Sequence, residues 1–221
     1  MPFGSHPRIA REGLPILLAL GAGALLLQYL FGLPAAAPLL LLLAAALYLL
    51  RDPYPNVPAD PLALICPAQG KIISVKRCDD PWLRREAWRI RIHMSPLSIF
   101  SFRSPTEGKV QEQWQRPPSR ENGGGRDYAA WVRTDEQDDV VLAVHIPRRL
   151  TNFRFWSHLS TGGRTGQGHR IGYLLLGGDF EVFTPVNVSI EVEPGQSVRS
   201  GNTILAHLVH NQQVSAIRQP P

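Results

Sequence analysis

The sequence has few of the features that mark metal sites, nucleic-acid binding or helical domains. It carries only two cysteines, Cys66 and Cys78, and no other Cys or His lies at metal-ligand spacing, so we predict no metal site. The net charge of +5 is modest and the basic residues are spread along the chain, which does not suit a nucleic-acid groove. Helical periodicity is absent after residue 51. The part beyond that point is therefore expected to be mainly β.

Charged residues and histidine are both absent from residues 14–50. One continuous helix over this stretch would be roughly 55 Å long, nearly twice the ~30 Å hydrocarbon core of a bilayer. Because Pro34 and Pro38 interrupt the run, we predict a membrane hairpin of two helices broken at residues 34–38. The second arm is short, so a re-entrant or tilted hairpin is one alternative, and a cleaved signal peptide is another.

Basic residues flank the hairpin on both sides. Arg8 and Arg11 precede it and Arg51 follows it. The positive-inside rule then places both chain ends in the cytoplasm, and the β domain on the cytoplasmic side of the inner membrane. In that compartment Cys66 and Cys78 would stay reduced.

Composition divides the chain into five segments. They are an N-terminal segment (1–13), the hairpin (14–50), a Pro-rich linker (51–64), a β domain (65–210) and a tail (211–221). Apolar and polar residues alternate over 88–94 and 186–193, and 140–146 is a nearly continuous apolar run. These patterns are typical of half-buried strands and of a central strand. Residues 115–128 are rich in Gly, Pro and polar side chains, which predicts a flexible loop.

A short repeat indicates how the strands fold. Gly162 and Gly168 recur as Gly195 and Gly201, at an offset of 33 residues. This spacing resembles the turn-and-strand unit of lipoyl-type folds, in which glycines adopt positive φ at tight corners. Residues 67–72 also recur at 105–110. We therefore predict a compact all-β sandwich of the barrel-sandwich kind, with the helical hairpin in the membrane.

Three blocks of the β domain carry a resemblance to a known family. They are Cys-Pro-Ala-Gln-Gly-Lys-Ile at 66–72, Met-Ser-Pro-Leu-Ser-Ile-Phe-Ser-Phe-Arg-Ser-Pro at 94–105, and Leu-Gly-Gly-Asp-Phe-Glu-Val-Phe-Thr-Pro at 176–185. With the hairpin and the Arg-Asp-Pro that follows it, they resemble the short, membrane-anchored branch of the phosphatidylserine decarboxylase family. That resemblance covers nearly the whole chain.

The resemblance implies a pyruvoyl-dependent carboxy-lyase whose catalytic positions are substituted here. In such enzymes a serine attacks the peptide bond before it and leaves an N-terminal pyruvoyl group, which acts as an electron sink. The family's Asp, His and Ser positions fall on Gln69, Phe100 and Gly178. None of these can supply the same chemistry. The only Gly-Ser dipeptide is at residues 4–5, so no pyruvoyl group is expected.

Three hypotheses follow. The leading one is a non-catalytic pseudoenzyme, a phospholipid-facing or assembly subunit of a membrane complex or homo-oligomer. The alternative is an active decarboxylase-type lipid enzyme that forms phosphatidylethanolamine with relocated catalytic residues. The third is a structural subunit that uses only its hairpin. No metal, cofactor or nucleic-acid partner is expected.

Other ionisable residues give no catalytic pattern. His93 alternates with arginines on a polar strand face, which favours a solvated role over substitution for the lost histidine. Asp179 and Glu181 stand beside the lost serine, where a turn aspartate is ordinary. The remaining histidines have no nucleophile or metal spacing, and we assign catalysis to none of them; they are His145, His158, His169, His207 and His210.

Overall fold

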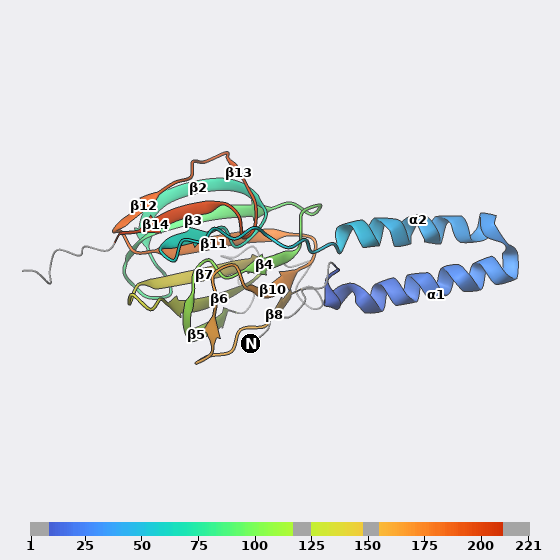
Figure 1. The fold of residues 1–221 in the computed structure, drawn as a ribbon, viewed down its shortest axis with the longest axis horizontal. Helices are drawn as coiled ribbons and strands as arrows, with labels where there is room; N and C mark the ends of the chain where they lie inside the picture. Colours follow the sequence, from blue (N-terminus) through green and yellow to red (C-terminus); the bar gives the residue numbers. More distant parts are fainter. Residues whose placement is uncertain (1–8, 117–124, 148–154, 210–221) are drawn as a thin grey trace, which may run out of the picture.

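The computed structural model describes residues 9–116, 125–147 and 155–209. Two apolar helices project from one end of a body of β-strands (Figure 1). Arg8, most of the predicted loop at 115–128, His210 and the tail 211–221 lie outside the described residues.

The helical elements come first in the chain and the strands follow. The helices are the 3-10 turn η1 (Arg11–Gly13), α1 (Leu14–Phe31) and α2 (Leu33–Leu49). The strands are β1 (Ala63–Ile65), β2 (Gly70–Asp79), β3 (Glu86–Met94), β4 (Ser101–Arg103), β5 (Gly108–Arg116), β6 (Arg126–Arg133), β7 (Asp139–Ile146), β8 (Phe155–Ser157), β9 (Arg164–Thr165), β10 (Arg170–Leu174), β11 (Gly178–Thr184), β12 (Val188–Ile190), β13 (Ser197–Val198) and β14 (Ile204–Leu208).

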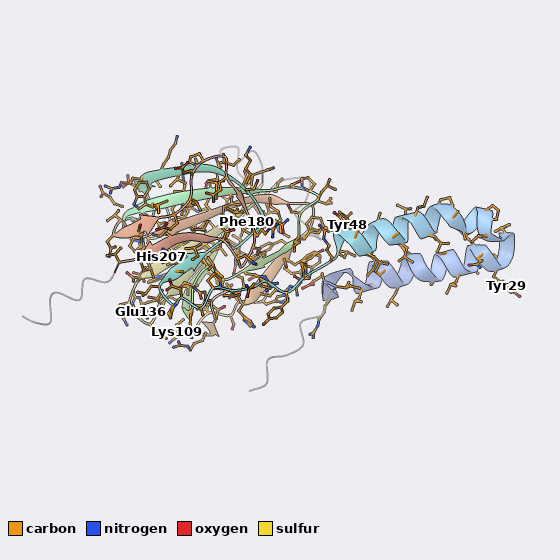
Figure 2. The ribbon with its side chains drawn as sticks, turned by 45° about the horizontal axis from the view of Figure 1, so that its top comes forward. Tyr29, Tyr48, Lys109, Glu136, Phe180 and His207 are labelled. Carbon is orange, nitrogen blue, oxygen red and sulfur yellow. The ribbon has the colours of Figure 1, made fainter. Side chains whose placement is uncertain are left out.

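The helices form an antiparallel hairpin, with Tyr29 at its tip and Tyr48 at its base (Figure 2). Each arm is roughly 25 to 27 Å long. With η1, α1 is long and apolar enough to cross a membrane, whereas α2 is shorter and equally apolar. Apolar side chains on both arms, such as Leu18 and Leu41, are more than two-thirds exposed. Such a surface suits lipid better than water.

The predicted break at residues 34–38 is wrong by a few positions. The chain turns at Gly32, whose φ of 81° is readily adopted only by glycine. Pro34 stands in the first turn of α2, where a missing N–H costs nothing, and Pro38 lies inside the helix. The second arm therefore starts at Leu33 rather than near residue 39.

The strands form one large sheet and two small ones. The large sheet has eight strands in the order β13-β2-β3-β11-β7-β6-β5-β9, and the small sheets are β1-β14-β12 and β4-β10-β8. Every pairing between these strands is antiparallel. The mainly β, sandwich-like fold is thereby confirmed.

The core lies on the inner face of the large sheet. Ile90, Ile92 and Phe180 are fully buried there together with Phe100 and Phe102. The predicted alternation in β3 is confirmed, and so is the central position of the apolar run in β7, which is buried at five consecutive residues. The alternating stretch at 186–193 forms only the three-residue strand β12.

The structure confirms the positive φ predicted for the repeated glycines. Gly162, Gly168, Gly195 and Gly201 all have φ between 71° and 92°. The N–H of Gly162 donates to Val110 O and that of Gly195 to Ile72 O, both at 2.8 Å. Ile72 and Val110 are also equivalent positions of the other repeat, 67–72 and 105–110. The two copies of each repeat therefore make the same backbone contact.

The Pro-rich segment packs on the domain instead of separating it from the hairpin. A Cβ on Gly201 would lie 2.8 Å from Pro55, and one on Gly168 would also contact Val57. The first strand begins at Ala63, two residues before the predicted start of the domain.

Candidate functional site

The three sequence blocks meet at one end of the large sheet. Met94, the last residue of β3, pairs with Gly178 at the start of β11. On its other side, a Cβ on Gly70 would lie 3.2 Å from Met94 Cα. The Phe100 carbonyl accepts a 2.8 Å hydrogen bond from the N–H of Leu174. The register thus brings the chain segments that carry residues 69, 100 and 178 to the same end of the sheet.

Gly178 follows a tight turn and has no room for a side chain. Leu176 and Gly177 have φ of 65° and 81°, a left-handed conformation that a branched residue such as Leu rarely adopts. A Cβ on Gly178 would lie 2.8 Å from His145 O and 2.8 Å from Leu174 Cδ2. The space that a side chain at this position would use is already filled.

Phe100 is a core residue. It is fully buried and packs edge-on against Tyr173, with ring centroids 5.9 Å apart at 83°. Burial raises the pKa of the Tyr173 hydroxyl far above its usual range. Tyr173 therefore stays protonated at neutral pH, and this pair provides no base.

Gln69 is half-buried, directly before β2. Among the described residues its amide makes no hydrogen bond. A neutral amide takes up no proton near pH 7. Phe100, Gln69 and Gly178 are the positions at which the resemblance predicts substitutions, and they offer an apolar ring, an amide and a glycine.

A buried ion network lies at the base of the hairpin. Arg170 contacts Glu12, just before α1, at 2.8 Å, and Asp52, just after α2, at 2.9 Å. Arg103 and Ser101 also donate to Asp52, at 3.2 and 2.7 Å. Burial lowers the pKa of Arg103, and the charge of Asp52 opposes that shift. Both ends of the hairpin are thus held to the β domain by side chains that are at most 10% exposed.

Sequence reasoning missed this network. Glu12 and Arg170 are 158 residues apart, and no local pattern connects them. The one signal in the sequence was that two charged residues, Asp52 after the hairpin and Arg103 in the second block, belong to the segments that carry the family resemblance.

Ionisable residues also form a row on the outer face of the large sheet. The ring N–H of His93 donates to Asp179 at 2.6 Å, and that of His145 donates to Asp127 at 2.7 Å. Asp179 is the direct cross-strand partner of both histidines. His93 is half-exposed, in agreement with the predicted polar strand face. Glu181 contacts neighbouring arginines on the same face.

The remaining described histidines are scattered. His158 donates to Glu12 at 3.0 Å, and His207 lies 3.1 Å from Asp60. His169 has a partner as well. Over residues 9–116, 125–147 and 155–209, no three His, Cys, Asp or Glu side chains gather in a way that would hold a metal ion.

Both cysteines are free thiols. Cys66 is fully buried, and burial raises its pKa to about 12. Cys78 is partly exposed and burial raises its pKa as well. Because the thiolate is the reactive form, neither is suited to act as a nucleophile at neutral pH.

These features define a class: an antiparallel β-sandwich domain carried on a tightly docked apolar hairpin, with a glycine turn at the end of its central sheet. A sequence profile of phosphatidylserine decarboxylase matches residues 42–206. The chain belongs to the phosphatidylserine decarboxylase family.

Several relatives are similar along almost their full length. The chain is 33% identical to the phosphatidylserine decarboxylase proenzyme of Nitrosomonas europaea over 215 residues, which cover 93% of this chain and 97% of the relative. It is 33% identical to that of Nitrosomonas eutropha, with 91% and 95% covered, and 31% identical to that of Burkholderia cenocepacia, with 92% and 97% covered. No solved structure gives a significant match.

Proposed function

We propose that this chain is a phosphatidylserine decarboxylase-family protein that does not process itself and carries no pyruvoyl group. On this proposal it acts at the inner membrane as a phospholipid-facing or assembly subunit. The single observation that carries the proposal is at Gly178, where the family pattern has its serine. The residue has no side-chain oxygen, and a Cβ there would lie only 2.8 Å from His145 O and from Leu174 Cδ2.

The two other substituted positions support the same conclusion. The Phe100 ring is part of the packed core, and the Gln69 amide cannot act as a base. Self-cleavage needs an activated hydroxyl. Neither the hydroxyl nor a group to activate it stands at the family positions.

The structure supports a membrane location in two ways. Tyr29 and Tyr48 lie at opposite ends of the hairpin (Figure 2), as expected for aromatic residues at the two membrane interfaces. Arg51 stacks on Tyr48 with its guanidinium carbon 3.8 Å from the ring centroid. With Arg8 and Arg11 also before the hairpin, we propose that the β domain lies on the cytoplasmic side.

An active lipid enzyme is the second candidate. The observation that favours it is the full-length similarity to proteins named as proenzymes. In that case another group would have to replace the missing serine. Such an enzyme would form phosphatidylethanolamine from relocated catalytic residues.

Intact mass spectrometry of the purified full chain separates the two candidates. We expect one uncleaved species of 221 residues. Cleavage at the family position, between Gly177 and Gly178, would release residues 178–221, a piece of 44 residues. Such a fragment with a pyruvoyl-blocked end would overturn the proposal. The Nitrosomonas europaea relative, prepared in the same way, is the positive control.

A further inference from the structure

Two turns of the β domain that carry apolar side chains lie next to each other. The first joins β3 to β4 and contains the exposed Leu97, and the second joins β10 to β11 and contains the half-buried Leu175 and Leu176. A Cβ on Gly177, in the second turn, would lie 3.1 Å from the carbonyl carbon of Ser95 in the first. The two turns therefore form one surface.

This surface lies at the end of the domain from which the hairpin projects. Met94 and Gly178, which border the two turns, pair with each other at one end of the large sheet. Ser101, shortly after the first turn, donates a 2.7 Å hydrogen bond to Asp52 at the base of the hairpin. Figure 1 shows β4, β8 and β10 on the side of the domain next to the hairpin.

The side chains at this end are apolar and exposed. Among the described residues outside the hairpin, Leu97 and Tyr54 are the most exposed of the large apolar side chains, at 69% each. Trp156 of β8 is 36% exposed and packs on Tyr173, with ring centroids 5.9 Å apart. Exposed aromatic residues at the base of an apolar hairpin are typical of a membrane interface.

Charge is distributed unequally between the two ends of the domain. Residues 95–100 and 174–178 contain no charged side chain. The turn between β6 and β7 is at the opposite end and contains three acidic residues, Asp135, Glu136 and Asp138, of which Glu136 lies far from the hairpin (Figure 2). Because the cytoplasmic leaflet is negatively charged, it repels the acidic end and accepts the uncharged one.

The buried ion network fixes this surface close to the hairpin. Glu12 lies two residues before α1 and Asp52 three residues after α2, and Arg170 of the β domain contacts both. Three extended residues span about 10 Å, so with the hairpin in a bilayer the docked end of the domain stays within that distance of the hydrocarbon core. The two turns then lie at the depth of the lipid headgroups.

We infer that the turns at Leu97 and Leu176 enter the headgroup region of the bilayer and, with Trp156, hold the β domain against the lipid surface. Lipid is the occupant because the surface continues the apolar hairpin: Leu49 of α2 packs against the same core cluster as Leu176. The Gly178 end of the large sheet is then at the lipid surface. The inference rests on the proposed membrane location of the hairpin and is independent of the proposal about self-processing.

A fluorescent label at residue 97 tests the inference. Leu97→Cys is labelled with an environment-sensitive dye in the full chain carrying Cys78→Ser, since Cys66 is fully buried, and reconstituted into nanodiscs that contain phosphatidylglycerol. We expect a blue-shifted emission that lipids spin-labelled near the headgroup quench. Val186→Cys is the matched control, because Val186 is also an exposed aliphatic residue but follows the other end of β11, about 20 Å along the strand. Its quenching should be several-fold weaker.

A label at Leu25 separates failure of this inference from failure of the proposed location. Leu25 lies on α1 and is 70% exposed, so lipids spin-labelled deep in the acyl chains should quench a dye on Leu25→Cys. If they do, and the residue 97 label behaves like the control, only this inference is overturned. If they do not, the hairpin is outside the membrane and both the location and this inference are wrong.

The unlabelled chain gives a second measurement. In nanodiscs of lipids brominated near the headgroup, part of the tryptophan fluorescence should be quenched. Trp156→Phe should remove most of that quenching, whereas Trp88→Phe should retain it, because Trp88 pairs with Thr184 at the opposite end of the sheet. Equal quenching in the two variants would overturn the inference. So would a blue shift at residue 97 that grows with protein density without lipid quenching, which would assign the surface to a second copy of the chain.

Discussion

Replacing Gly178 by serine tests directly whether the family position is closed. The added Cβ would meet His145 O and Leu174 Cδ2 at 2.8 Å each, closer than atoms of this kind approach in folded proteins. Leu174 can move its terminal carbon, but the His145 oxygen belongs to the backbone of β7, which pairs on both sides. Overpacking of this kind costs about 1 to 3 kcal/mol.

The assay is thermal unfolding of the full chain in detergent, followed by the fluorescence of its five tryptophans. For a chain of this size the cost corresponds to a fall in Tm of roughly 2 to 12 °C. The matched control is Gly166→Ser. A Cβ on Gly166 meets nothing within 4 Å, so its Tm should stay within a degree or so of that of the unaltered chain.

Intact mass is measured on the same samples. Gly178→Ser should remain uncleaved, because Gln69 and Phe100 supply no base, and groups of a catalytic unit act together. The triple variant that also carries Gln69→Asp and Phe100→His is the minimum change from which we expect any cleavage. A single variant with unchanged Tm that releases the 44-residue piece would refute the reasoning on all three positions.

Four further predictions concern the ion network, the two thiols and the hairpin. Asp52→Ala should lower the free energy of unfolding by about 3 to 5 kcal/mol, because it leaves the charges of Arg103 and Arg170 buried with fewer partners. A decrease below about 1 kcal/mol would contradict a stabilising role for the network. Cys78 should react with iodoacetamide before Cys66 in the native chain. Burial raises the pKa of Cys66 from about 9 to about 12, so between these pH values only the unfolded chain ionises this thiol. As pH rises through this range, the free energy of unfolding of the unaltered chain should fall by about 1.4 kcal/mol per pH unit relative to that of Cys66→Ala. Parallel pH profiles of the two chains would show that the thiol is accessible. Reporter fusions at the two chain ends should both give a cytoplasmic signal, and opposite signals would mean that only one helix crosses the membrane.

Much of the fold could be predicted because its signals are local. Alternation in β3 and the apolar run in β7 depend on residues two positions apart, and burial in the structure follows the same pattern. The repeated glycines predicted corners that need positive φ, and all four have it. Charge-free residues 14–50 predicted the hairpin.

The hairpin break shows where local reasoning failed. Pro34 and Pro38 predict an interruption, but proline is tolerated in a first helical turn, and the chain turns at Gly32 instead. Which of several breakers is used depends on how the two arms pack against each other. That choice was not visible in the composition.

The identities of Gln69, Phe100 and Gly178 were evident from the sequence, and they led to the hypothesis that the family's self-processing chemistry is missing. Only the tertiary structure decided that the space at Gly178 is filled and that Phe100 is a core residue. The ion network at the hairpin base and the row of ionisable residues on the outer face of the large sheet were likewise decided by folding. Both join residues from strands and turns far apart in the chain, and their contacts depend on strand register, which no single segment encodes.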